Sequence, residues 1–535
     1  MFFPYNDLRE YIADLETNNE LIRVTEEVSA EFEITEIADR ISKEQGKAPG
    51  EKSLNKAILF ENVKGYDLPV LINAMGSHKR MQMGLGVYSG NETELEANPC
   101  SGYDIIGDRI RSLIKPELPF TLGDKISKIF ELSELRHVIP KKVKIAPCQE
   151  VVILAKDSHT LKGSTGEKLL DKIPILKCWP EDGGPFITLT SVFTRDPDKL
   201  GAGRNVGMYR LQKFNDITTG MHWHKHHDGA SNYTKTLKTV ENLDLGKESG
   251  TGKPQKRMEI AIAIGNDPCI PYAATAPLPP GIDEMLMAGF IRKKPVELVK
   301  CKTIDIEVPA TSEIVLEGYL DLNEDPVVEG PFGDHTGFYS LADLYPKFHL
   351  TALTHRKNPI YATTIVGIPP QEDCYLGKAT ERIFLPLLQL VCPEITDMNL
   401  PWEGVFHNCA LVKIKKRYPA HAHKVMHTIW GTGQLAWTKY VIIFDDEVNI
   451  QNPSEAAMHA FGNTDPNRDI LFSKGPLDIL DHASQVQAFG SKMGIDATRK
   501  WESEGFTREW PNLIIMSQDI KDLVSSKWDK YFPEN

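Results

Sequence analysis

Two carboxylates stand five residues apart in the segment Glu329-Gly-Pro-Phe-Gly-Asp334-His-Thr-Gly-Phe-Tyr. Glycine and proline between them favour a tight turn, so both side chains are expected close together. Like charges held close cannot both ionise cheaply, and one carboxyl then keeps its proton while the other serves as a base. An acidic surface turn explains the same residues. The flanking stretches 313–319 and 348–353 have strand patterns, which favours a catalytic loop held by rigid elements.

Histidines are concentrated in the segment 221–228, Met-His-Trp-His-Lys-His-His-Asp. If residues 221–226 are extended, His222, His224 and His226 share one face of a strand and Trp223 lies on the other. Three histidines on one face suggest a zinc site. No cysteine or glutamate lies nearby at a familiar zinc spacing, so a solvated or hydrogen-bonded strand edge stays open as the alternative.

A harder cation fits the neighbouring residues better. Asn205 offers an amide oxygen, a histidine of this region offers a nitrogen and Glu284 offers a carboxylate, a set typical of Mn²⁺ or Mg²⁺. Arg210 and the backbone amides near Gly207 and Gly229 suit a phosphate that the metal would bridge to the protein. No Walker A sequence or complete G-x-G-x-x-G fingerprint occurs, so NAD and P-loop nucleotide binding are not predicted.

One further segment combines a lysine, a serine and glycines, Gly490-Ser-Lys492-Met-Gly-Ile-Asp-Ala-Thr498. Such residues suit a phosphate contact through Lys492. An ordinary loop that opens a helix explains them equally simply, and both interpretations stay open.

Composition limits the class of protein. The chain has 535 residues, with 61 Lys plus Arg against 74 Asp plus Glu and a net charge of −13, which disfavours a general nucleic-acid surface. The hydrophobic fraction of 41% is that of a globular protein, no apolar run approaches the roughly 20 residues of a membrane span, and no signal peptide is evident. We therefore expect a cytoplasmic protein whose eight widely spaced cysteines are reduced thiols.

Helix and strand patterns predict a mixed α+β and α/β fold in three regions and a tail. The regions are 1–120, an N-terminal α/β region; 121–340, rich in strands that suggest a barrel or a strongly curved sheet; 341–515, a second α/β region; and 516–535, a terminal amphipathic helix that would pack on a neighbouring subunit. Helices are expected at 7–15, 31–43, 104–114, 379–390, 420–430 and 518–532. Strands are expected at 57–60, 70–73, 186–193, 206–211, 217–224, 259–264, 296–302, 408–414 and 440–444.

In their order along the chain, these motifs resemble the UbiD family of (de)carboxylases. The resemblance covers nearly the whole chain, from Tyr5-Asn-Asp-Leu-Arg to Thr507-Arg-Glu-Trp510. Within the family, the nearest likeness is the branch that decarboxylates 3-polyprenyl-4-hydroxybenzoate in bacterial quinone biosynthesis. The family fold implies a central split β-barrel flavin-binding domain between an N-terminal α/β region and a C-terminal α/β oligomerisation domain.

The resemblance also implies a cofactor and its ligands. Members of the family bind prenylated FMN, made by a separate flavin prenyltransferase, with Mn²⁺ joining the cofactor phosphate to the protein and often K⁺ nearby. Carried over by motif, the metal ligands are Asn205, His226 and Glu284. The residues implied beside the cofactor are Met208, Tyr209, Arg210, His222, Trp223, His224, His227, Asp228 and Lys492.

Arg210, Glu329 and Asp334 resemble the family's network of an arginine, a glutamate and an acid. The resemblance implies that Asp334 donates the proton that replaces CO₂, with Glu329 as its partner and Arg210 as the charge that keeps Glu329 ionised. The quinone-pathway branch carries aspartate at the position of Asp334 and the cinnamic-acid type carries glutamate, so the resemblance implies a hydroxybenzoate-like substrate. The chain departs from the quinone-pathway branch near the flavin, where His222, His224, His227 and Asp228 replace Arg, Leu, Arg and Gly.

The implied reaction is a reversible, non-oxidative decarboxylation of an aromatic acid by a homo-oligomer of two to six subunits. Peripheral membrane association follows if the substrate carries a polyprenyl chain. Three alternatives stay open: decarboxylation of another phenolic or aryl acid in catabolism, an oxidoreductase on unmodified FMN, and a non-catalytic metal-bound assembly component.

Overall fold

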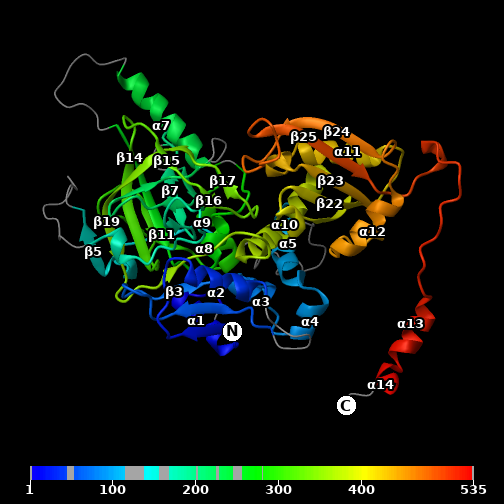
Figure 1. Ribbon diagram of the computed structural model, residues 1–535, viewed down its shortest axis with the longest axis horizontal. Helices are drawn as coiled ribbons and strands as arrows, with labels where there is room; N and C mark the ends of the chain where they lie inside the picture. Colours follow the sequence, from blue (N-terminus) through cyan, green and yellow to red (C-terminus); the bar gives the residue numbers. More distant parts are fainter. Residues whose placement is uncertain are drawn as a thin grey trace, which may run out of the picture.

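The computed structural model describes residues 3–44, 53–114, 138–155, 168–199, 203–223, 228–244, 256–279 and 281–532. The N-terminal and central parts lie together, and the C-terminal sheet lies to one side of them (Figure 1). Helices α5 (Ser101–Ile114) and α10 (Glu372–Val391) pack against each other between the two lobes. The fold is mixed α and β, as the sequence predicts.

The N-terminal region is a small sheet covered by helices. Helix α1 (Leu8–Thr17) begins after Asp7, whose carboxylate accepts a hydrogen bond from the Glu10 amide at 3.0 Å, an N-cap that ends the preceding loop. The other helices are α2 (Glu33–Ser42), α3 (His78–Gly84) and α4 (Glu92–Ala97). The sheet runs β1 (Leu21–Val24), β2 (Ala57–Phe60), β3 (Val70–Ile72), β20 (Tyr361–Ala362). Because β20 comes from far along the chain, this sheet ties the N-terminal region to the central one.

The central region is built on one large sheet whose long strands are almost wholly buried. Its strands, in sheet order, are β10 (Thr218–Gly220), β19 (Lys347–His355), β14 (Ile314–Asp321), β11 (Arg257–Ile264), β7 (Ser191–Arg195) and β8 (Arg204–Gly207), with β5 (Val151–Leu154) also paired to β19. Helices α7 (Asp228–Asp244), α8 (Cys269–Ala273) and α9 (Glu284–Arg292) belong to the same region. Among the described residues no ladder joins β8 to β10, so the sheet does not close into a barrel.

Several short ladders complete the central region. They are β6 (Phe186–Ile187) with β9 (Leu211–Gln212); β13 (Glu307–Pro309) with β12 (Glu297–Lys300) and β4 (Lys141–Val143); β15 (Val327–Glu329) with β18 (Asp343–Tyr345); and β16 (Phe332–Gly333) with β17 (Tyr339–Ser340). The predicted strands 186–193 and 206–211 are therefore each two strands. Both are divided because the chain passes from the β6–β9 ladder into the large sheet.

The strand predicted at 217–224 is shorter than expected. Strand β10 ends at Gly220, which pairs with Lys347, and the residue before Lys347 is Pro346. The Met221 amide still donates to the Pro346 carbonyl at 2.9 Å, but proline has no N–H to return a bond, so the ladder ends here. The strand predicted at 217–224 therefore ends at Gly220, and the placement of His222, His224 and His226 on one strand face stays untested, because residues 224–227 lie outside the described part of the chain.

The C-terminal region is a five-stranded sheet flanked by helices. In order, its strands are β21 (Ile395–Asn399), β22 (Cys409–Ile414), β23 (Tyr440–Asp445), β25 (Phe489–Asp496) and β24 (Ile470–Pro476), and its helices besides α10 are α11 (His421–Trp430) and α12 (Pro453–Asn463). The segment 490–498 is thus mostly strand β25, paired on both sides, and the interpretation as a loop opening a helix is wrong.

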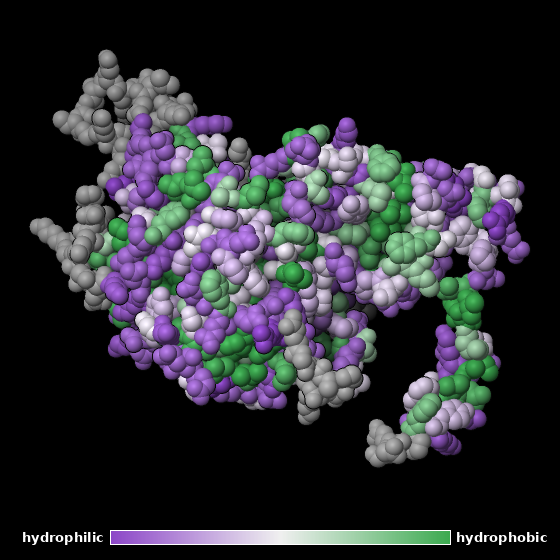
Figure 2. All heavy atoms as spheres, in the orientation of Figure 1, coloured by the Kyte–Doolittle hydropathy of each residue, from purple (hydrophilic) through white to green (hydrophobic). Residues whose placement is uncertain are grey.

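The chain ends in an arm that leaves the body. The helix predicted at 518–532 is two helices, α13 (Gln518–Ser525) and α14 (Trp528–Tyr531), because no packing partner within the described chain holds the intervening Ser526 and Lys527 in one helix. Its apolar side chains are exposed, with Ile514 fully so and Trp528 at 55%, and they gather along the arm in Figure 2. No helix among the described residues is long and apolar enough to cross a membrane.

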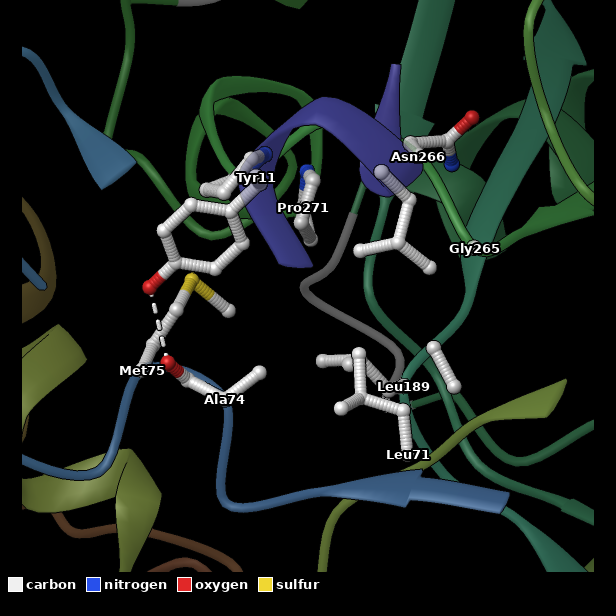
Figure 3. A pocket seen from close by; sticks show the side chains of 11 residues that line it. Tyr11, Leu71, Ala74, Met75, Leu189, Gly265, Asn266 and Pro271 are labelled. Carbon is white, nitrogen blue, oxygen red and sulfur yellow. Dashed lines mark hydrogen bonds between the residues drawn. The ribbon is translucent and has the colours of Figure 1, made fainter. Parts of the chain in front are cut away.

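A small apolar cavity lies where α1, β3 and α8 meet (Figure 3). Leu71, Ala74 and Leu189 contribute to its wall, and the Tyr11 hydroxyl donates to the Ala74 carbonyl at 2.8 Å. None of the residues that the sequence predicts for the site lines it. We therefore interpret it as a packing gap between the N-terminal and central regions.

Candidate active site

The acidic loop 329–334 is buried. Glu329 is the last residue of β15 and is fully buried, and Asp334, just after β16, is 7% exposed. The loop is held at two backbone positions: the Gly330 amide donates to Gln212 Oε1 and the Gly333 amide donates to Asp182 Oδ1, each at 2.8 Å. These contacts and this burial exclude the alternative of an acidic surface turn.

Arg210 joins the two carboxylates. Its Nε and Nη2 donate to Glu329 Oε1 and Oε2 at 2.9 and 3.1 Å, and its Nη1 donates to Asp334 Oδ2. Nη2 also lies 3.0 Å from Ser340 Oγ. The guanidinium rests on the ring of Phe332 at 4.4 Å, which fixes its plane. The structure thus brings together the three residues predicted to form the acid network.

The pKa shifts of the two carboxyls differ from the sequence expectation that one of them keeps its proton. Burial alone would raise the pKa of Glu329, but hydrogen bonds from His222 and Arg210 outweigh it and hold that pKa below the usual range. Burial opposes ionisation of Asp334 too, yet its hydrogen bonds to His335 and the charge of Arg210 lower its pKa strongly. Because Arg210 lies between them, the two negative charges are compensated and both carboxyls are ionised.

Histidines extend the network at both ends. His222 Nδ1 lies 2.9 Å from Glu329 Oε2, and its ring packs on Tyr345 at 4.3 Å. At the other end His335 Nδ1 lies 2.9 Å from Asp334 Oδ1, and His335 Nε2 lies 2.8 Å from His407 Nε2. Burial lowers the pKa of His222, whereas the Asp334 hydrogen bond overcomes burial and raises the pKa of His335 to about 9.

The residues predicted to bind metal converge in part. Glu284 opens α9 after the N-cap Asp283, and its carboxylate faces β8: Oε1 lies 3.2 Å from Asn205 Nδ2, and Oε2 accepts from the Val206 amide at 2.7 Å. Asn205 Oδ1 accepts from Thr194 Oγ1 at 3.3 Å. His226, the third predicted ligand, lies outside the described residues.

The carboxylate of Glu284 suits a cation. It is 6% exposed and, among the described residues, no lysine, arginine or histidine lies within ion-pair distance of it. Burial therefore raises the pKa of Glu284 to about 8, with Asp283 and Asp228 adding repulsion. A bound divalent ion would supply the missing positive charge, and a carboxylate with an amide oxygen suits Mn²⁺ or Mg²⁺.

Several of the residues predicted to contact the cofactor follow Asn205 in the chain or contact one another. Met208 and Tyr209 follow β8, Trp223 packs edge-on against Tyr209 at 5.9 Å, and Asp228 is the first residue of α7. The Gly229 amide at that helix start lies 3.4 Å from the Tyr209 hydroxyl. His224 and His227 lie outside the described residues.

Lys492 lies elsewhere, in the C-terminal sheet. Its ammonium donates to the backbone carbonyls of Ala436 and Thr438, the latter at 3.1 Å. Burial lowers the pKa of Lys492 to about 8. No contact joins Lys492 to Arg210, Glu284 or Glu329 in the described chain, so its role at the cofactor phosphate stays a prediction.

The sequence analysis missed three members of the network: Ser340, His335 and His407. The position of His335 next to Asp334 was a usable signal, because adjacent titratable groups on a turn commonly interact. Ser340 and His407 carry no local signal. They meet the network only through the β16–β17 ladder and through the packing of the C-terminal region on the loop.

Comparison with known proteins gives matches along most of the chain. The N-terminal, Rift-related and C-terminal domains described as 3-octaprenyl-4-hydroxybenzoate carboxy-lyase, of the UbiD family, match residues 12–95, 141–369 and 374–497. An uncharacterised protein of Aquifex aeolicus is 47% identical over 530 residues, covering 99% of each chain. An uncharacterised protein of Archaeoglobus fulgidus is 46% identical over 527 residues, covering 98% of each.

Solved structures of similar fold include two enzymes. Vanillic acid decarboxylase from Sedimentibacter hydroxybenzoicus, in its closed form, has a TM-score of 0.79 at 27% identity, covering 99% of each chain. The UbiD-class enzyme HmfF from Pelotomaculum thermopropionicum, in complex with FMN, has a TM-score of 0.72 at 26% identity, covering 97% of this chain and 99% of that one. An evolved dimeric form of HmfF, in complex with prFMN, has a TM-score of 0.71 at 26% identity, covering 97% and 98%.

Proposed function

The chain belongs to the UbiD family of carboxy-lyases, and from this premise we propose that it decarboxylates an aromatic acid without net oxidation, using prenylated FMN. The observation that carries the proposal is the buried ion cluster of Arg210, Glu329 and Asp334. A charged cluster is costly to bury, and here it is buried beside the residues expected to contact a flavin.

The residues of the cluster have distinct parts in the proposed reaction. Loss of CO₂ from an aromatic ring leaves an electron pair of high energy, and prenylated FMN, when bound, supplies the electron sink for it. A proton must then replace CO₂ on the ring carbon. Asp334 delivers this proton, Glu329 fixes the position of Arg210 through a bidentate contact, and Arg210 holds both carboxyls ionised between turnovers.

Asn205 and Glu284 would hold Mn²⁺, with His226 as the third ligand. Buried Glu284 has no cationic partner among the described residues, which supports this assignment, and the metal would join the cofactor phosphate to the protein. K⁺ would be a second cation near the cofactor phosphate.

For the substrate we propose a hydroxybenzoate-like acid. The similarity to a vanillic acid decarboxylase supports a phenolic acid, and aspartate at position 334 is in line with it. A polyprenylated quinone precursor would bring the enzyme to the membrane surface, while an acid without that chain would serve catabolism. His222, beside Glu329 and Tyr345, is one of the residues that would separate these two cases.

The proposal extends to the domain organisation, the cofactor supply and the oligomeric state. We propose that the central region folds as a split β-barrel around the cofactor, with domain boundaries at 120 and 515. The boundary predicted at 340 moves beyond His355, because strands β18 and β19 belong to the central region. A flavin prenyltransferase would supply the cofactor. The exposed apolar side chains of the C-terminal arm would be covered in a homo-oligomer, and the dimeric form among similar structures supports self-association.

The proposal is tested by purifying the protein after co-expression with a flavin prenyltransferase. The bound cofactor should have the mass of prenylated FMN, Mn²⁺ should co-purify, and CO₂ should be released from 4-hydroxybenzoate, vanillate or 3,4-dihydroxybenzoate. Unmodified FMN with turnover of NAD(P)H would instead establish the oxidoreductase alternative. If the protein binds no flavin at all, the result would favour the alternative of a non-catalytic, metal-bound assembly component.

A further inference from the structure

The hydrogen-bonded chain continues beyond Asp334 into the C-terminal region. Asp334 Oδ1 accepts from the backbone amide of His335 at 2.8 Å and faces His335 Nδ1 at 2.9 Å. His335 Nε2 then meets His407 Nε2 at 2.8 Å, and Phe406 stacks on the His335 ring at 5.3 Å. The loop that holds Asp334 is therefore in direct contact with the segment before β22.

Both oxygens of Asp334 face nitrogen donors, Arg210 on Oδ2 and His335 on Oδ1. In this arrangement Asp334 rests as a carboxylate. To protonate a product, it must first receive a proton from a group in contact with it. Arg210 does not release protons in proteins, so His335 is the one contact of Asp334 in the described chain that can supply one.

Exposure increases along the network toward His335. The side chain of Glu329 is fully buried, those of Arg210 and Asp334 are 8% and 9% exposed, and that of His335 is 21% exposed. Of these four groups, His335 is therefore the one best placed to exchange a proton with water.

The charges around His335 favour its cationic form. The titratable and charged groups that face it from the elements packed around it are Asp334, His407, Asp373, Asp478 and, behind Asp334, Arg210; Asp481 faces His407. Acids outnumber bases in this set, and the Asp334 hydrogen bond raises the pKa of His335 to about 9. Burial and the charge of His335 lower the pKa of His407 to about 4, so His407 is neutral and accepts from His335. His407 Nδ1 has no partner among the described residues.

We propose that His335 stores the proton that Asp334 delivers, and that His407 positions the His335 ring from the C-terminal region. This inference rests on the proposed decarboxylation. The Nδ1–H bond of His335 breaks as the Oδ1–H bond of Asp334 forms. Asp334 then gives this proton to the carbon that has lost CO₂ and is again a carboxylate. Water reprotonates His335, and no electrons are gained or lost by the protein.

The first test reads the protonation of His335 without turnover. The full chain, labelled with ¹³C at histidine Cε1, is titrated by NMR from pH 5.5 to 10, and His335→Gln assigns the signal. We expect a His335 pKa above 7.5 in the wild type and a fall of at least about one unit in Asp334→Asn, which removes the negative partner. A wild-type His335 pKa of 7.5 or below would overturn the inference.

The second test uses the cofactor-loaded enzyme. A stored proton is present below the pKa of His335, so kcat should be full there and fall as the pH rises through that pKa. His335→Gln should lower kcat by about 10- to 100-fold at neutral pH and remove this alkaline limb, a change expected of a lost proton source. His407→Ala should move the limb to lower pH, because it removes the acceptor that favours the His335 cation. A His335→Gln enzyme with wild-type kcat across this range would refute the proton store.

His349→Gln is the matched control. His349, on β19, also pairs with a carboxylate, Glu324. Within the described chain it makes no hydrogen bond or ion pair with the acid network, so its loss should leave kcat and the pH profile unchanged. The two tests also separate this inference from the proposed function. If the wild type releases no CO₂ from any aromatic acid, the proposed function fails, while the NMR titration still decides the protonation of His335.

Discussion

Two sets of buried carboxyls in the central region have opposite surroundings. The first group is the pair Glu329 and Asp334, and the second is Glu284 with its partner Asn205. Glu329 and Asp334 share Arg210 and each has a histidine partner, and both of their carboxyl pKa values are held low. Glu284 is buried to a similar degree, but its partners are an amide side chain and a backbone N–H, and its pKa is raised to about 8.

The contrast shows how a protein assigns different tasks to the same functional group. A carboxylate whose counter-charge is built into the chain is ready for proton chemistry at fixed geometry. A carboxylate without one is poised to bind a cation from solution, since binding relieves the cost of its burial. Four substitutions, taken first, each affect one of the two groups, from the largest expected effect to the smallest, and Asp334→Asn then tests the central claim.

Arg210→Ala should damage the first group most. Two buried carboxylates then lack their cation, so the pKa of Glu329 should rise, kcat should fall by about 10²–10³-fold, and the free energy of unfolding should fall by about 3–5 kcal/mol. Denaturant unfolding and CO₂ release measure the two effects. Arg292→Ala is the matched control, because Arg292 pairs with buried Asp267 at 3.0 Å elsewhere: it should cost stability while folded molecules keep their kcat. An Arg210→Ala enzyme within tenfold of wild-type kcat would remove Arg210 from the account.

Asp334→Glu tests whether the first group depends on position as well as charge. One added methylene moves the carboxyl by about 1 Å, and such a displacement can cost about 10²-fold in rate. Decarboxylation of 4-hydroxybenzoate-like acids should therefore suffer more than substrate binding, as seen in kcat compared with KM. A wild-type rate on the native substrate would make Asp334 a structural turn residue.

The sequence predicts those helices and strands whose pattern is set by residues close together in the chain. Helix α1 and the strands β2, β11 and β22 follow from side-chain periodicity, and they lie where expected. Strand β25 was missed because its glycines indicate a loop. At Gly494 a Cβ atom would lie 2.4 Å from Met426 Sδ, so this glycine allows helix α11 to pack closely on the sheet.

The same distinction between local patterns and long-range contacts holds for the site residues. The acid pair at 329 and 334 is visible in a single segment, but the contact between Asn205 and Glu284 joins residues far apart in sequence. Ligand chemistry and the family resemblance indicate this contact, and no local spacing does. No pattern around His407 predicts its contact with His335, because that contact arises from packing between two regions. The low pKa values of both carboxyls depend on where His222, His335 and Arg210 lie, which the spacing of the acids does not determine.

Glu284→Gln should affect the second group and spare the first. Without the carboxylate charge, Mn²⁺ affinity should drop at least about tenfold and cofactor retention should drop with it, as measured by metal analysis and flavin absorbance. Glu317→Gln is the control: Glu317 is also buried, in β14, but its oxygens accept from the backbone amides of Lys302 and Thr303. Equal metal content in Glu284→Gln and wild type would contradict the metal assignment.

Asn232→Ala should have the smallest effect. Asn232 Nδ2 donates to Thr194 Oγ1 at 3.1 Å, and Thr194 in turn holds Asn205, so its loss should weaken Mn²⁺ binding by less than about tenfold. Isothermal titration with Mn²⁺ measures this. Asn266→Ala removes a buried asparagine bound to Ser312 instead and should leave Mn²⁺ affinity unchanged. If both variants weaken Mn²⁺ equally, general destabilisation explains the result.

The central claim is that the buried cluster performs the proton step of a decarboxylation, and Asp334→Asn tests it most directly. The substitution keeps the shape of the side chain and removes its ionisable proton. In enzyme loaded with prenylated FMN, CO₂ release per bound cofactor should fall by about 10²–10⁴-fold while cofactor occupancy stays at the wild-type level. A loss of less than tenfold at full occupancy would contradict the account and assign the proton to another group.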